Sequence, residues 1–97
     1  MNCILEENVD NVTITFFDNP ENHVKAHMSK REIFALSSFG VPAHLKMVEV
    51  AFRELYKIDE NVDVHSVVDF ASKDIQDTIN YLEQKFKTIA KEYEDVH

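Results

Sequence analysis

Five histidines and one cysteine are the side chains in this 97-residue chain with the clearest capacity for metal or nucleophilic chemistry. His23 and His27 are four residues apart, a spacing that on a helix brings two imidazoles to one metal ion. The residues around them alternate as in a β-strand, where the two side chains lie about 13 Å apart at about 3.3 Å per residue. No ligand partner close in the sequence accompanies the remaining candidates, which are His44, His65, His97 and Cys3. We therefore expect no metal site and no cofactor.

Carboxylates and serines are the other candidates for catalysis. A general acid–base pair needs two carboxyl groups in a pocket that drives their pKa values apart. The acidic residues instead fall in expected turns and near residue 95. The serines lie outside a G-x-S-x-G setting, and no phosphate-binding loop or nucleotide fingerprint occurs. We therefore expect that the protein is not an enzyme.

Alternation of apolar and polar residues predicts the strands that would position these side chains. It covers residues 12–17 and 23–28, and the short apolar run 3–6 supplies a further strand. The polar stretches 7–11 and 18–22 read as turns. We expect a three-stranded antiparallel meander whose inward-facing residues include Val12, Ile14, Phe16, Val24, Ala26 and Met28.

Two helices joined by a sharp turn should follow the meander. Ser29 and Glu32 have the spacing of a capping box, so a helix begins there. Gly40 can take the left-handed conformation that ends a helix, and Pro42 suits the first turn of the next helix, which should run to about residue 57. The residues expected to face the core are Ile33, Leu36 and Phe39 on the first helix, and Leu45, Val48, Phe52 and Leu55 on the second.

A heptad stripe marks the last helix, which should begin near Ser72 and reach about residue 94, a length near 30 Å at about 1.5 Å per residue. Val68 and Val96 extend the stripe, and residues 64–71 fit either a short strand or the first turns of this helix. The stripe is the core face of a helix lying across the sheet, a homodimer seam or partner interface, or a mixture of the two, and we expect the mixture. Its residues are Ile75, Ile79, Leu82, Phe86, Ile89 and Tyr93.

These elements predict one α+β domain over residues 1–97: a small N-terminal antiparallel β-meander packed on a helical hairpin and a long C-terminal helix. A mainly helical domain with one N-terminal β-hairpin is the alternative. The first residues lack the basic start and apolar run of a signal peptide, and no apolar stretch approaches the roughly 18 residues that cross a bilayer. The single cysteine fits a reducing compartment, so we expect a cytoplasmic protein with no membrane partner.

Charge is the strongest compositional signal. Eighteen acidic against ten basic residues give a net charge of −8. Residues 29–57 are the exception, because their five basic and three acidic residues give +2 and leave −10 on the remainder. A DNA duplex repels such a chain on average, which argues against direct nucleic-acid binding.

The helical hairpin nevertheless supports an alternative. Residues 31–33 (REI), 40–41 (GV) and 51–55 (AFREL) make this quarter of the chain resemble winged-helix regulators, although Pro42 stands where such motifs have a capping Ser or Thr. The resemblance implies a dimeric helix-turn-helix DNA-binding transcriptional regulator. Its DNA contacts would be Lys46, Arg53 and Lys57. In that case Arg53→Glu should abolish DNA binding and largely spare a protein interaction.

Acidic loops at 6–10, 18–21, 59–63 and 92–95 support our preferred hypothesis. Gathered in space, they would meet a basic patch on another protein, or its nucleic-acid-binding surface; ordinary solubility is the alternative explanation. We expect a small acidic non-enzymatic binding protein, an inhibitor or antagonist of the antitoxin, immunity-protein or phage-inhibitor kind. The residues expected to contact the partner are Phe17, Phe34, Val50, Tyr56, Tyr81, Asp59, Glu60 and Asp63.

Overall fold

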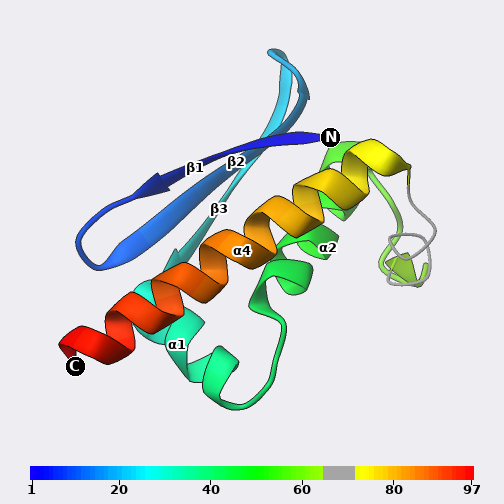
Figure 1. Ribbon diagram of the computed structural model, residues 1–97. Coiled ribbons are helices and arrows are strands. Elements are labelled where there is room, and N and C mark those ends of the chain that lie inside the picture. The colour runs from blue at the N-terminus through cyan, green and yellow to red at the C-terminus, as the bar shows by residue number, and fades with distance from the viewer. Residues whose placement is uncertain (65–71) are drawn as a thin grey trace.

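The N-terminal third of the chain forms the predicted meander. In the computed structural model, which describes residues 1–64 and 72–97, strands β1 (Asn2–Glu7), β2 (Asn11–Asn19) and β3 (Asn22–Ser29) pair antiparallel in the order β1-β2-β3 (Figure 1). Helices α1 (Lys30–Ser38), α2 (Ala43–Tyr56) and α4 (Lys73–Val96) follow. The α+β class is therefore confirmed. The predictions for residues 65–71, which include His65 and Val68, lie outside the described residues.

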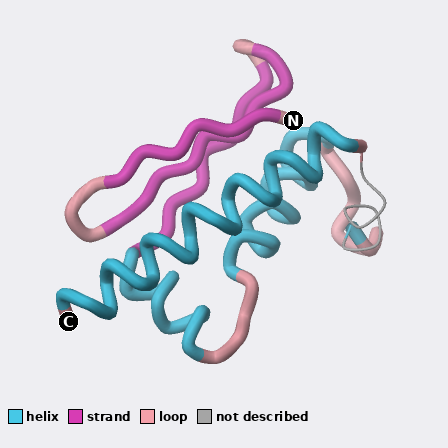
Figure 2. Tube along the Cα trace, in the orientation of Figure 1, coloured by secondary structure: helices cyan, strands magenta, loops and turns pink. Residues whose placement is uncertain are grey.

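Helices α1, α2 and α4 lie on one face of the sheet, and no segment within residues 1–64 and 72–97 covers the other face (Figure 2). The covered face carries Val12, Ile14 and Phe16, which are fully buried, because side chains two residues apart on a strand point the same way. Their neighbours on β3 are half-buried and pack against the same core, as predicted. They are Val24, Ala26 and Met28. Ile4, on the uncovered face, is 53% exposed.

Helix α1 begins and ends where its sequence signals predict. The hydroxyl of Ser29 accepts a hydrogen bond from the backbone N–H of Glu32 (3.0 Å), and Gly40 has a φ of +71°. Beyond the helix, the Val41 N–H donates to the Leu36 carbonyl (2.8 Å), which closes a Schellman-type turn. The prediction that Phe39 faces the core is wrong: Phe39 is the C-cap residue and is 83% exposed, because the helical periodicity that would turn it inward ends one residue earlier.

Helix α2 turns back from α1 with a bend of 118°. Its buried residues include the predicted Val48, Phe52 and Leu55, whereas Leu45 is only half-buried. Ala43 is also buried (5% exposed), because the 3.6-residue period places Ala43, Met47 and Ala51 on one core-facing side of the helix.

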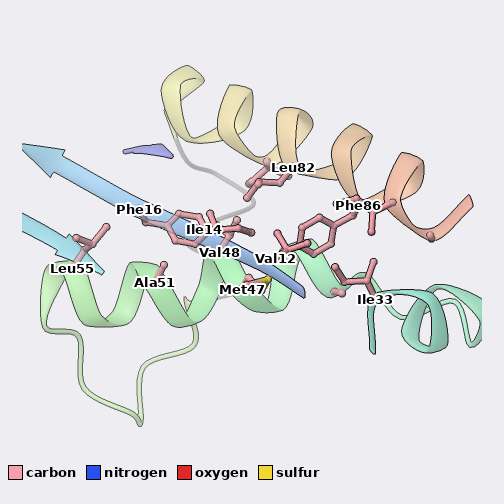
Figure 3. Packing of buried hydrophobic residues seen from close by; sticks show 14 residues of the cluster. Val12, Ile14, Phe16, Ile33, Met47, Val48, Ala51, Leu55, Leu82 and Phe86 are labelled. Atoms are coloured by element: carbon pink, nitrogen blue, oxygen red, sulfur yellow. The ribbon is translucent and has the colours of Figure 1, made fainter. Parts of the chain in front are cut away.

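The heptad stripe of α4 completes the core. Leu82 is fully buried, and Leu82 and Phe86 point from α4 toward Val12 and Ile14 of the sheet, while α2 borders the same cluster of side chains opposite α4 (Figure 3). The two ends of the stripe, Ile75 and Tyr93, are half-buried, and Val96 is 79% exposed. For its central residues the dimer-seam interpretation is corrected, because they are covered by the chain's own sheet and helices. These residues are Ile79, Leu82, Phe86 and Ile89.

None of the helices in the described part of the chain is by itself long and apolar enough to cross a membrane. Helices α1 and α2 meet that criterion only when taken together, and the chain bends sharply between them.

Candidate protein-interaction site

The acidic loops lie at two ends of the molecule and do not form one cluster (Figure 1). The β1–β2 turn and the last residues of α4 lie at one end, and the β2–β3 turn and the loop that follows α2 lie at the other. The molecule measures 39 Å along its longest axis. A single partner surface therefore meets one pair of loops at a time, and the second pair has the more defined geometry.

At that second end, the β2–β3 turn is fastened to the C-terminus of α2. The Tyr56 hydroxyl donates to Asp18 Oδ1 (2.6 Å), and Asn22 Nδ2 donates to the Leu55 carbonyl (3.2 Å). Burial, followed by the contact with Asp18, raises the pKa of Tyr56 to about 12. The Tyr56 ring packs beside Phe52 at 4.7 Å between centroids and is still 41% exposed. The ring is thus held in place while part of its surface faces solvent.

Arg53 holds the acidic loop that follows α2. Its guanidinium donates to the backbone carbonyls of Asp59 (2.8 Å) and Val62 (2.7 Å). Within the loop, Asp59 Oδ1 accepts from the Asn61 N–H at 2.8 Å. The Asp59 and Glu60 side chains are exposed, and Val62 is 45% exposed. This arrangement fixes the backbone from which the two carboxylates project.

We call the resulting surface the acidic end. Four exposed acidic residues, an exposed aromatic ring and an exposed aliphatic side chain lie on these two segments, and the predicted contact Asp63 follows directly in the same loop, exposed. Of the predicted contact set, Tyr56, Asp59 and Glu60 belong to this surface. The acidic end consists of Asp18, Glu21, Tyr56, Asp59, Glu60 and Val62.

The other predicted contact residues lie on separate elements. Phe17 is half-buried on the uncovered face of the sheet, opposite His23. Val50 of α2 is 53% exposed, and Tyr81 of α4 is 44% exposed with Lys85 Nζ 5.7 Å from its ring centroid. Phe34 was expected to lie outside the core as a partner anchor. It is instead half-buried, with its ring 5.3 Å from that of Tyr93, because α1 packs on α4.

The DNA-contact set predicted on α2 is corrected at Arg53. Both terminal nitrogens of its guanidinium donate to loop carbonyls, so the side chain is not directed outward as a contact to a DNA groove requires. Lys46 is exposed, and Lys57 is an exposed C-cap residue next to the acidic end with a φ of 52°. The bend of 118° between α1 and α2 falls in the range of helix-turn-helix motifs, about 90–120°. The backbone of the hairpin therefore has the predicted shape, but its three basic side chains do not form one free cluster.

The exposed apolar residues that the sequence analysis missed include Phe39 and Val62. Phe39 was expected in the core, and its position directly before Gly40 was the signal that it caps the helix. Val62 stands alone among acidic residues in its loop, so periodicity offered no sign of its exposure.

The residues considered for metal or nucleophilic chemistry stay apart. His23 and His27 both lie on β3, and His27 Nδ1 is 3.0 Å from the Thr13 hydroxyl. Over residues 1–64 and 72–97, no group of three or more His, Cys, Asp or Glu side chains is placed to hold a metal ion. Burial raises the pKa of the Cys3 thiol to about 11, so this thiol is protonated and a weak nucleophile at neutral pH.

No protein-family model, curated protein or solved structure matches this chain.

Proposed function

We propose that this protein is a non-enzymatic binding protein that occupies a basic surface of a protein partner, as small inhibitors and antagonists do, and that the acidic end is its contact surface. The observation that carries the proposal is the pair of hydrogen bonds from Arg53 to the loop carbonyls of Asp59 and Val62. They fix a loop that carries two exposed carboxylates and that begins directly after Tyr56, whose side chain is 41% exposed. Because the loop is already ordered, association costs less conformational entropy.

Charged and apolar residues of such a surface contribute to different steps of binding. The carboxylates at its rim attract a basic partner and raise the association rate, an effect that falls with ionic strength. Tyr56 and Val62 supply area that loses water on contact, and tyrosine is enriched among the residues that dominate binding energy. We therefore expect charge reversal to act mainly on the association rate, and truncation of Tyr56 to act mainly on the dissociation rate.

A charge-reversal pair tests the contact surface. The double variant Asp59→Lys/Glu60→Lys changes the acidic end, and Glu92→Lys/Glu94→Lys makes the same charge change on exposed residues at the opposite end. Proteins retained by the immobilised wild-type chain are identified by mass spectrometry, and the affinity of the purified partner is then measured by calorimetry. We expect the first variant to lose at least tenfold in affinity and the control to stay within about twofold. Equal losses for both variants would show that only net charge matters.

Duplex DNA separates this proposal from the transcription-regulator alternative. We expect no binding of duplex fragments in fluorescence anisotropy even at low salt, because a duplex repels a chain of net charge −8. Sequence-selective binding that Lys46→Glu abolishes would replace our proposal with the regulator. Arg53→Glu is not a clean test, because it also removes the two hydrogen bonds that hold the acidic loop.

We also propose that the protein acts in the cytoplasm. The support is compositional: a chain with a single cysteine forms no internal disulfide, which suits a reducing compartment.

A further inference from the structure

A pocket of about 230 Å³ opens where the α1–α2 turn meets α4. For comparison, an apolar cavity of about 150 Å³ accommodates a benzene molecule. The pocket has an apolar floor and a polar rim, and the Glu83 and Lys87 side chains of the rim pair at 3.0 Å, so the rim carries no net charge from these two groups. The floor comprises Ile33, Ala43 and Phe86, and the rim comprises His44, Glu83 and Lys87.

Phe39 directly precedes Gly40, which lines this pocket, and Phe39 itself is 83% exposed and is not a lining residue. An aromatic side chain that is mostly exposed in water gains free energy when another surface covers it. An exposed ring and a recess of sufficient size, adjacent to each other in the chain, supply the two halves of a self-complementary contact. A two-fold axis brings two such surfaces together, and each ring then enters the recess of the other copy.

The charge distribution favours a second copy as the occupant. Two chains of −8 repel each other most strongly where acids dominate, whereas residues 33–45, which contain Phe39 and the α1–α2 turn, include no Asp, Glu, Lys or Arg. The turn also lies away from the acidic end, with α2 between them (Figure 1). Two copies can therefore meet there with the least repulsion and with both acidic ends still exposed.

We infer that this chain forms a two-fold symmetric homodimer in which Phe39 of each copy occupies the pocket between the α1–α2 turn and α4 of the other. This interface differs from the α4 seam, whose central residues are buried within one chain. It also goes beyond the proposed function, because it neither uses nor covers the acidic end.

Sedimentation velocity from micromolar to near-millimolar concentration tests this inference. We expect the wild-type chain to shift from monomer to dimer across this range, and Phe39→Ala to raise the dimer dissociation constant at least tenfold, as loss of a central aromatic anchor does. Because Phe39 is exposed in the monomer, this variant should keep the melting temperature of a dilute wild-type sample. Val9→Ala is the matched control, since Val9 is 89% exposed at the β1–β2 turn.

A mixing experiment tests whether the two contacts are reciprocal. Ser37 is exposed and lines the pocket, so Ser37→Trp blocks the recess and leaves Phe39 intact. Neither variant alone can form a Phe39–pocket contact, but a mixture of Phe39→Ala and Ser37→Trp restores one such contact per dimer. We expect the mixture to dimerise at least tenfold more tightly than either variant alone. A wild-type chain that stays monomeric, a Phe39→Ala chain that dimerises like wild type, or a mixture without recovery would each overturn the inference, and none of them would affect partner capture by the acidic end.

Discussion

The Tyr56 hydroxyl lies 2.6 Å from Asp18 Oδ1 and donates a hydrogen bond that joins the end of α2 to the β2–β3 turn. The two residues are 38 positions apart in the sequence. Asp18 also lies 3.7 Å from the Met1 ammonium group. This contact places the carboxylate near the end of β2 and the aromatic residue at the end of α2 on one surface.

Replacement of Tyr56 by Phe should remove this bond and little else. We expect the free energy of unfolding to fall by about 0.5–1 kcal/mol, because a net hydrogen bond contributes about that much and the partly exposed Asp18 recovers water. Urea denaturation followed by circular dichroism measures the change. Tyr81→Phe is the control, since Tyr81 is similarly exposed on α4. Equal effects of the two substitutions would mean that the Tyr56–Asp18 bond contributes nothing specific.

Leu82 should behave as a core residue and not as a dimer contact. It is fully buried in a single chain, so Leu82→Ala should lower the free energy of unfolding by about 2–5 kcal/mol through lost burial and the cavity left behind. Leu82→Asp should unfold the chain, because an unpaired charge would be buried. Thermal unfolding and sedimentation report the two results, with Tyr81→Ala as the exposed neighbour. A folded, smaller species from Leu82→Asp would restore the seam interpretation.

His44 should make the stability depend on pH in the mildly acidic range. Burial lowers its pKa; Glu83 opposes this effect and Lys87 adds to it. Since the pKa in the folded chain lies below that in the unfolded chain, the unfolded chain binds the proton first as the pH falls. Stability should therefore decrease as the pH falls through about 6.5, and the loss should be complete below the folded-state pKa.

The pH effect is measured as the unfolding free energy in urea between about pH 5 and about pH 7.5. His44→Gln should flatten this part of the curve. The Glu83–Lys87 pair gives a separate signal at lower pH: it lowers the pKa of Glu83, so its contribution is lost as the pH falls below the usual carboxyl range. If the stability of His44→Gln depends on pH as that of the wild type does, the pH dependence does not come from His44.

Cys3 should react slowly in the folded protein. With a pKa of about 11, only about one thiol in a thousand is a thiolate at pH 8. Alkylation by iodoacetamide, followed by mass spectrometry, should be at least tenfold slower in the native chain than in the same chain unfolded in urea. Equal rates in the two conditions would show that the thiol is not shielded by the packing of β1 against the helices.

The sequence by itself determined the local elements. Alternation placed Val12, Ile14 and Phe16 on one face of a strand, because side-chain direction has a period of two there whatever the strand packs against. Ser29 began α1 and Gly40 ended it, because capping depends on atoms within a few residues. The length of α4 followed from its heptad stripe in the same way.

Only the tertiary structure decided which parts of the chain the faces of these helices contact. Periodicity required that the stripe of α4 be buried, but the return of the chain over its own sheet made that burial intramolecular. From its position on the helix alone, Arg53 could contact DNA or hold a neighbouring loop. In the folded chain it holds the loop, because residues 59–62 bring two backbone carbonyls within hydrogen-bonding distance of its guanidinium. Such contacts join segments whose relative placement is set by the packing of the whole core, and that information is not local to any stretch of sequence.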